Sequence, residues 1–223
     1  MKHITFYLDF ISPYAYLAFE HLPDALQGLS YSVSYKPVLF AGMLKHYGQL
    51  GPAEIAPKRD WTYRQVLWLA HKLEIDLQVP QSHPFNPLPL LRIAAQCAMP
   101  AEHNVASEAI TINRYVCESI FRHVWLGGAD AADPQRLEAL AQQLASQQRL
   151  PADEAKAALK NNTGEAIAQK VFGVPAFVVD DRVFWGLDAL PMLRDYLLES
   201  PWFSGPDWES VHQVSVGASR QLS

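Results

Sequence analysis

The first forty residues place apolar runs and turn residues in a strand, helix, strand order. Residues 3–10 form a short run of alternating aromatic and aliphatic side chains, which is typical of a buried strand. Ser12 and Pro13 follow, a favoured N-cap and a favoured first helical residue, so we expect a helix to begin here and to stop near Pro23. Residues 32–38 fit a second strand. This order predicts a βαβ unit with a right-handed crossover.

The middle of the chain carries apolar residues mostly at helical spacing. The spacing predicts helices over 61–73, 88–98, 107–125 and 134–146, and two shorter helices over 151–160 and 163–172. The strand pattern then returns at 176–179 and 183–185 around a turn at Asp180 and Asp181, which predicts a hairpin. Residues 187–198 close this series as an amphipathic helix.

The order βαβ, helical block, ββα is that of an α/β thioredoxin-like fold with an inserted all-helical domain. We therefore expect a discontinuous thioredoxin-like domain over 1–40 and 165–200 and a helical insertion over 41–164. Residues 201–223 are rich in Ser, Gly and polar residues and are expected to form a loosely held C-terminal tail.

Composition indicates a globular protein and argues against some classes of binding partner. Hydrophobic residues make up 49% and charged residues 18% of the chain, which is enough apolar material for a core. The net charge is −5 and the longest basic cluster is Lys58-Arg59, which argues against a nucleic-acid binder. No apolar run approaches the roughly 20 residues of a membrane span. Because the N-terminus lacks a signal-peptide pattern, a cytoplasmic, reducing compartment is expected.

The two cysteines, Cys97 and Cys117, belong to neither a CxxC motif nor a paired His/Cys spacing typical of zinc. Neither a disulfide framework nor a metal site is therefore predicted. Both lie in helical patterns and are expected to be buried and inert.

Three segments combine residue types that can carry chemistry. Ser12 lies at a strand-to-helix junction, where unpaired N–H groups and the helix dipole stabilise an anion, although a serine there is more often only an N-cap. Val174-Pro175 contains a candidate cis-proline, with Gly173 as a candidate helix C′ residue, but a plain helix stop is the alternative. Asp188 precedes the last helix and is either a cap or a contact to a cationic ligand group.

Four motifs together resemble the family of 2-hydroxychromene-2-carboxylate isomerases and kappa-class glutathione transferases, a branch of the DsbA-like thioredoxin superfamily. They are FYLDFISPYAYL at 6–17, HPFNPLPLLR at 83–92, KVFGVPAFVV at 170–179 and VFWGLDAL at 183–190. The resemblance covers roughly residues 3–200. The first and third motifs are the most specific, because their spacing and order match as well as their residues.

The resemblance implies that Ser12 is the catalytic residue and glutathione the cofactor. The slot that holds CxxC in related disulfide oxidoreductases here begins with Ser12 and contains no cysteine, so ordinary dithiol–disulfide exchange is excluded. In this family the serine hydroxyl holds the sulfur of glutathione, and a hydrogen bond to the thiolate lowers the pKa of the thiol. The nucleophile is then the sulfur of the cofactor, and the protein supplies position and electrostatics.

The resemblance also implies which residues contact the rest of glutathione. Val174, before the expected cis-Pro175, pairs its backbone with the cysteinyl unit as an added strand would. Leu187 and Asp188 match positions that bind the γ-glutamyl end, where a carboxylate suits the α-ammonium. Gln49 and Lys58 fall near positions that contact the glycyl and central parts, with Arg59 as a rival to Lys58 and a solvated surface lysine as the alternative.

The helical insertion is expected to roof the site. Asn86 is then a contact to the substrate, although a turn residue before Pro87 is the alternative. His83 and His46 could donate protons, but a surface or capping role is more typical of each. Trp61 and Trp68 are expected in the core or at an interface.

For the isomerase branch, the implied reaction converts 2-hydroxychromene-2-carboxylate to trans-o-hydroxybenzylidenepyruvate. The thiolate adds, the ring opens, a bond rotates, and glutathione leaves unchanged. In the transferase branch glutathione stays on an aromatic or electrophilic product. A non-catalytic, DsbA-like peptide-binding protein is a third possibility, which the missing CxxC permits. Members of the family are often homodimers, so a homodimer is also expected.

Overall fold

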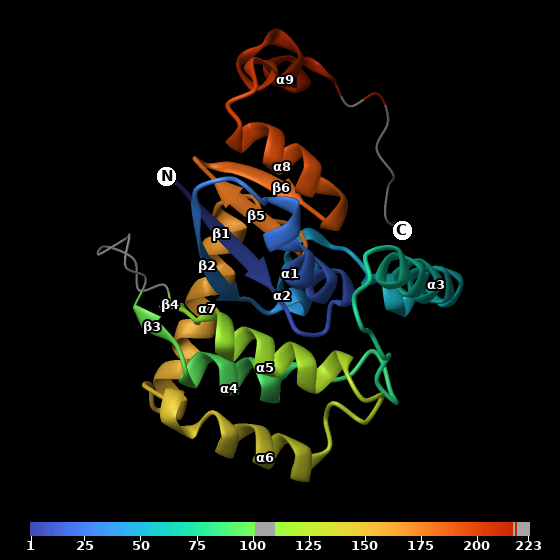
Figure 1. The fold of residues 1–223 in the computed structure, drawn as a ribbon, viewed down its shortest axis with the longest axis vertical. Coiled ribbons are helices and arrows are strands. Elements are labelled where there is room, and N and C mark those ends of the chain that lie inside the picture. The colour runs from blue at the N-terminus through green and yellow to red at the C-terminus, as the bar shows by residue number, and fades with distance from the viewer. Residues whose placement is uncertain (101–109, 216, 218–223) are drawn as a thin grey trace.

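The computed structural model describes residues 1–100, 110–215 and 217, and a four-stranded mixed sheet runs through it (Figure 1). The strands are β1 Lys2–Leu8, β2 Tyr31–Pro37, β5 Ala176–Val179 and β6 Arg182–Trp185, in the order β2-β1-β5-β6. β1 pairs parallel with β2 and antiparallel with β5, and β5 pairs antiparallel with β6. The predicted α/β class, a thioredoxin-like sheet interrupted by helices, is confirmed.

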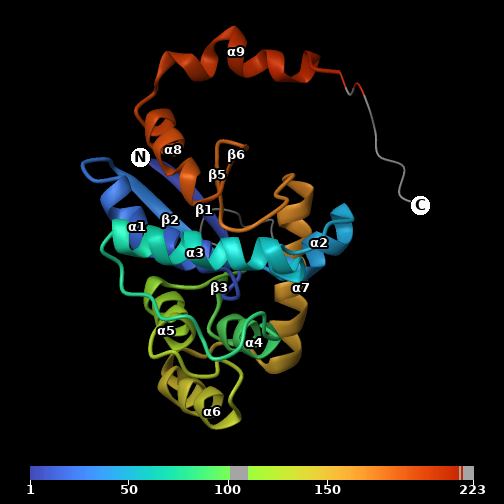
Figure 2. The ribbon, with the colours of Figure 1, turned by 90° about the vertical axis from the view of Figure 1, so that its right-hand side faces the viewer.

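The two faces of β1 belong to two hydrophobic cores, as the alternation of a strand requires. Ile4, Phe6 and Leu8 pack in the larger core with α1, Pro13–Ala25, and with the inserted helices. Tyr7 faces the other way, into a smaller core with residues of α2, Phe40–Tyr47, and α7, Ala152–Ala168. Helices therefore cover both faces of the sheet (Figure 2).

The helix α1 begins where the sequence places it but ends later. Ser12 is its N-cap and Pro13 its first residue. The stop predicted near Pro23 falls two residues later, since the helix runs through this proline to Ala25. Proline removes one backbone hydrogen bond, yet Leu22 and Leu26 on either side of it are buried and hold the last turn by packing.

The insertion contributes α3 Ala56–Lys72, α4 Leu88–Gln96, α5 Arg114–Trp125 and α6 Pro134–Gln143, with short turns η1 Pro52–Glu54 and η2 Ala145–Gln147. α4, α5 and α6 pack together beyond one end of the sheet, while α3 contacts α1 (Figure 2). Within the described residues, no helix combines the length and apolarity needed to cross a bilayer. Both cysteines, Cys97 and Cys117, are buried and free.

The helix predicted over 107–125 starts later than expected. Asn113 caps α5, with its Oδ1 accepting a hydrogen bond from the N–H of Val116 at 2.9 Å. Before it, β4 Ile110–Thr111 pairs with β3 Met99–Pro100. Residues 107–109 of the predicted helix lie outside the described residues.

The two helices predicted over 151–160 and 163–172 are one helix, α7. Asn162, at the expected break, is fully buried, and its Nδ2 donates to the carbonyl oxygens of Pro37 and Ile110 at 3.1 and 3.0 Å. Thr163 Oγ1 donates to Leu159 at 2.9 Å and accepts from the N–H of Leu39 at 3.0 Å. The polarity of these two residues predicted a helix break. Their side chains instead make hydrogen bonds to residues that are distant in the chain, so the helix continues.

The exit of α7 also differs from the prediction. The helix ends at Ala168, and Lys170, with φ 62°, takes the left-handed conformation that follows a helix end. Gly173 was expected in that role, and that expectation is wrong.

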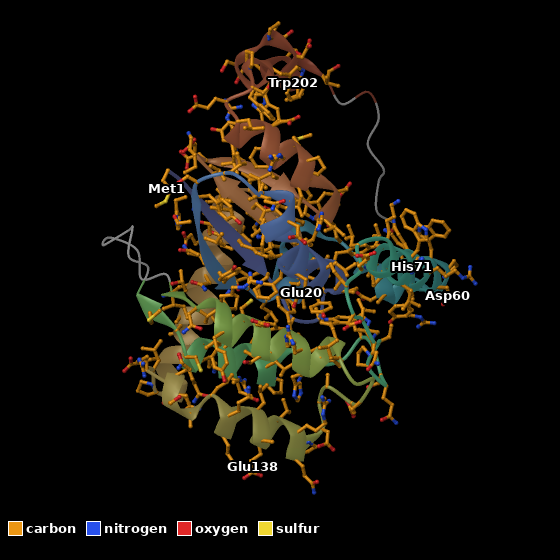
Figure 3. The ribbon with its side chains drawn as sticks, in the orientation of Figure 1. Met1, Glu20, Asp60, His71, Glu138 and Trp202 are labelled. Carbon is orange, nitrogen blue, oxygen red and sulfur yellow. The ribbon has the colours of Figure 1, made fainter. Side chains whose placement is uncertain are left out.

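Residues 201–213 are not the loosely held tail that the sequence predicted. They form η4 Pro201–Ser204, α9 Pro206–Glu209 and η5 Ser210–Gln213, which follow α8, Leu190–Leu197. Phe203 is 4% exposed, and Trp208 stacks on Phe184 with ring centroids 6.4 Å apart. The segment, marked by Trp202 in Figure 3, therefore has an aromatic anchor on the sheet. Composition alone misleads here, because a few aromatic residues hold a segment that is otherwise polar.

Candidate functional site

Ser12 caps α1 and also faces the segment before β5. Its Oγ accepts from the N–H of Ala15 at 3.2 Å, so the capping role is real. The same Oγ donates to the carbonyl oxygen of Val174 at 3.5 Å, which is long for such a bond and therefore weak. The side chain is 8% exposed. A hydroxyl held at a positive helix end, with its hydrogen only weakly engaged, can turn that hydrogen to an anion.

A buried carboxyl group supports the turn that carries Ser12. Asp9 is fully buried at the end of β1, and its carboxyl oxygens accept from the N–H groups of Ile11 at 3.2 Å and Phe40 at 2.9 Å. Its own carbonyl accepts from the N–H of Ser12 at 3.0 Å. Burial raises the pKa of Asp9 to about 7, against the effect of the N–H donors. Sequence reasoning missed this residue, although an acidic residue inside the apolar run 3–10 is a visible signal.

A histidine from the insertion holds the other side of the same turn. His83 Nε2 donates to the carbonyl oxygen of Ile11 at 2.7 Å, and Nδ1 pairs with the hydroxyl of Tyr63 at 2.7 Å. Since a carbonyl only accepts, the neutral ring carries its hydrogen on Nε2. Burial lowers the pKa of His83, which favours that neutral form. The expected surface or capping role is therefore wrong, because His83 joins α3 to the residue before Ser12.

The Val174-Pro175 peptide is cis, as the sequence predicted. Val174 is 8% exposed, and its N–H has no acceptor among the residues that the structure describes. Gly173 lies against Trp185, whose Nε1 would be 2.6 Å from any added Cβ. The backbone opposite Ser12 therefore offers one free donor and one weakly engaged carbonyl to an extended ligand.

Leu187 and Asp188 follow Gly186, whose φ of 98° suits glycine. A Cβ at Gly186 would lie 2.3 Å from Asp188 Oδ1, so a side chain there would displace this carboxylate. Asp188 lies in η3 Leu187–Ala189, and Gly186 and Ala189, the N-caps of η3 and α8, have no side-chain cap bond. Asp188 therefore does not cap a helix, which was one of the two roles that the sequence allowed. Its side chain is exposed.

A cavity of about 580 Å³ joins several of these residues. Val174, Pro175, Leu187 and Asp188 all line it. Residues of α1 and α3 form its opposite wall. Tyr14 of α1 belongs to this wall, and its hydroxyl donates a hydrogen bond to Gln65 of α3 at 2.7 Å. Another hollow, of about 500 Å³, lies between α5 and α6 and contains none of the predicted site residues.

Four predicted site residues lie outside the lining of this cavity, and Ser12, which contacts it through Val174, is one of them. Gln49 and Lys58 are exposed, the former just after α2 and the latter in the first turn of α3. Arg59 is the alternative to Lys58, and its Nε lies 3.9 Å from Oδ1 of Asp60. Asn86 Oδ1 accepts from the N–H of Leu88 at 3.1 Å, which is the turn role that the sequence left as the alternative. His46 is also exposed.

Comparisons with known proteins point to one family. A family model for the DSBA-like thioredoxin domain matches residues 3–198. A 2-hydroxychromene-2-carboxylate isomerase from Sphingobium xenophagum is 29% identical over 207 residues, covering 89% of this chain and 99% of that protein. Glutathione s-transferase kappa 2 from Caenorhabditis elegans is 26% identical over 221 residues, covering 92% of this chain and 95% of that protein.

A solved structure of a 2-hydroxychromene-2-carboxylate isomerase matches with a TM-score of 0.66 at 22% identity, covering 92% of this chain and 98% of that chain. At this identity the likeness concerns the fold.

Proposed function

This chain belongs to the DsbA-like thioredoxin family, and from that premise we propose that it is a glutathione-dependent enzyme of the 2-hydroxychromene-2-carboxylate isomerase type. The observation that carries the proposal is the pairing of Ser12 Oγ with the carbonyl of Val174 at 3.5 Å, since Val174 lines the cavity that the exposed Asp188 also lines. The residues around this pair offer a hydroxyl, a free backbone donor and a carboxylate, which are the groups that a γ-glutamyl-cysteinyl ligand needs.

Ser12 has the central role in the proposed reaction. Bound glutathione would supply the thiol whose sulfur adds to an unsaturated substrate and leaves again. Ser12 donates its hydroxyl hydrogen to that sulfur, and the N-terminus of α1 adds favourable potential, so the thiolate form is stabilised. Val174 orients the ligand through its N–H and carbonyl, and Asp188 binds an ammonium group.

The isomerase is the first candidate because two observations favour it together. The relative from Sphingobium xenophagum carries that name and is covered over 99% of its length. In addition, the slot that begins with Ser12 lacks cysteine, so the chain cannot use dithiol chemistry there. A kappa-type transferase is the second candidate, supported by the similarity to the Caenorhabditis elegans protein. A peptide-binding protein is less favoured, because a peptide backbone has no need of the carboxylate of Asp188.

The first experiment is calorimetric titration with reduced glutathione. We expect the wild type to bind, and Asp188→Ala to bind about tenfold more weakly, the effect of one lost charge-assisted contact of about 1.4 kcal/mol. Asp195→Ala is the matched control, since Asp195 is exposed on α8, which directly follows η3, and does not line the cavity. Absence of binding at millimolar glutathione would reject the proposal and bring the peptide-binding alternative forward.

The second experiment separates isomerase from transferase. The enzyme is incubated with 2-hydroxychromene-2-carboxylate or with an electrophilic aromatic compound, and free thiol is counted alongside product. An isomerase regenerates glutathione, so product forms with thiol constant. A transferase consumes one thiol for each product molecule.

We also propose a homodimer in a reducing compartment such as the cytoplasm. Trp61 and Trp68 are two turns apart on α3 and are 62% and 59% exposed. Asp60 and His71, labelled in Figure 3, flank them on the same outward helix. Sedimentation of the wild type and of a Trp61→Ser/Trp68→Ser variant tests whether these rings lie in a subunit interface.

A further inference from the structure

The cavity lined by Val174 and Asp188 also contains a cation. Arg194, on α8, lines it together with His21 and Ala25 of α1. Arg194 Nη1 donates to the carbonyl oxygens of Ala25 and Gln27 at 3.0 and 2.9 Å. These two bonds fix the guanidinium at the C-terminal end of α1, where a cation is favoured.

The guanidinium still has unused capacity. Only its Nη1 finds acceptors in the part of the chain that the structure describes, which leaves the hydrogens of Nη2 and Nε for another partner. None of the ion pairs formed among those residues includes Arg194. Arg194 is therefore a half-buried cation in a cavity wall, with free donors and no carboxylate partner. Such a group is suited to bind an anion.

The walls between the two ends of the cavity are apolar. Leu69 and Leu73 come from α3, and Leu190 comes from the start of α8. Asp188 and Arg194 are six residues apart on one largely helical segment, which at 1.5 Å per residue separates them by about 9 Å along the axis. The cavity thus has an acidic end at Asp188, an apolar middle and a basic end at Arg194.

We infer that Arg194 determines specificity for the second substrate, by binding the carboxylate of an acid with a flat apolar body. The inference rests on the proposed function in assigning the acidic end to glutathione. The ammonium and carboxylate of a γ-glutamyl group sit on the same carbon. If Asp188 holds the ammonium, the carboxylate beside it stays near the acidic end and leaves Arg194 to another molecule.

The test compares two ligands of equal shape and different charge. Binding of 2-naphthoate and of neutral 2-naphthamide is measured by calorimetry on the wild type, Arg194→Gln and Arg194→Lys. Glutamine keeps a donor for the carbonyls at the end of α1 but has no charge, and lysine keeps the charge. We expect the wild type to prefer naphthoate by about tenfold, Arg194→Lys to keep part of that preference, and Arg194→Gln to lose it.

The controls decide against a purely structural arginine. Circular dichroism melts establish that the variants fold, and glutathione affinity should be equal in the wild type and Arg194→Gln. Equal weakening of both naphthalene ligands, or no preference in the wild type, would overturn the inference, as would a selective loss of glutathione affinity in Arg194→Gln. If glutathione fails to bind while the naphthoate preference and its loss in Arg194→Gln persist, the proposed function fails and the carboxylate subsite stands.

Discussion

Replacing Asp9 with asparagine would remove a fully buried carboxyl group from beneath the Ser12 turn. Asp9 has no solvent-exposed surface, and its two oxygens meet the N–H groups of Ile11 and Phe40. Asparagine has nearly the same shape and cannot ionise. Its amide oxygen accepts from one of the two N–H groups, but its NH2 group cannot accept from the other, so one hydrogen bond is lost. This loss is the same at every pH, so the pH dependence of the stability isolates the effect of charge.

The size of the effect follows from the pKa. Burial raises the pKa of Asp9 from 3.8 to about 7. At about 1.4 kcal/mol for each tenfold change in proton affinity, this corresponds to about 4 kcal/mol. The unfolded chain releases the proton near pH 3.8 and the folded chain only near pH 7. Between these values the folded state binds more protons, so the free energy of unfolding falls as pH rises.

Urea denaturation at several pH values measures this contribution. From about pH 5 to about pH 8, the wild type should lose about 2–3 kcal/mol more than Asp9→Asn loses. Asp195→Asn, an exposed carboxyl on α8, should follow the wild type. Parallel curves for the wild type and Asp9→Asn would refute the reasoning. Such curves would mean that the N–H donors outweigh burial and keep Asp9 ionised in the folded state.

Three further substitutions test other parts of the structure. Ser12→Ala should lower turnover by roughly 10²–10³-fold and should also lower the stability by about 1 kcal/mol, because α1 loses its cap. A thermal melt measured beside the rate assay separates these two effects. Unchanged turnover would remove Ser12 from the mechanism. Lys36→Met leaves Glu165, its partner at 2.7 Å, without a cation and should lower the free energy of unfolding by about 1–3 kcal/mol in urea denaturation, whereas a double variant that also carries Glu165→Leu should regain most of it. Phe203→Ala should cost about 3 kcal/mol, and an unchanged melting temperature would show that residues 201–213 are not anchored.

Local signals predicted the parts of the fold that depend on neighbours in sequence. The start of α1 follows from Ser12 and Pro13, and β1 follows from the short apolar run. The continuity of α7 could not be predicted in this way, because the partners of Asn162 and Thr163 include Pro37 and Leu39, more than a hundred residues earlier. Two adjacent polar residues such as these predict a helix break when their distant hydrogen-bond partners are not known.

The same distinction applies to the site. Val174, Pro175, Leu187 and Asp188 lie in one cavity because the β5–β6 hairpin carries both segments, and the hairpin was predictable. Gln49, Lys58 and Asn86 belong to the insertion, whose placement depends on side-chain packing that the spacing of residues does not encode. That packing brings the second half of α3 into the cavity wall and leaves these three residues outside it, while Ser12, which is not part of the insertion, only contacts Val174 in that wall.

The insertion nevertheless reaches the site through one residue. His83 donates to the carbonyl of Ile11 at 2.7 Å, while the carbonyl of Asp9 accepts from the N–H of Ser12 at 3.0 Å. Both ends of the Ile11–Ser12 peptide are therefore held, one by the insertion and one by β1. A hydroxyl that must stabilise a thiolate gains most when its backbone does not have to reorganise. Under the proposed function, the role of the insertion is therefore to fix the turn that carries Ser12, and this role does not depend on whether Asn86 touches a substrate.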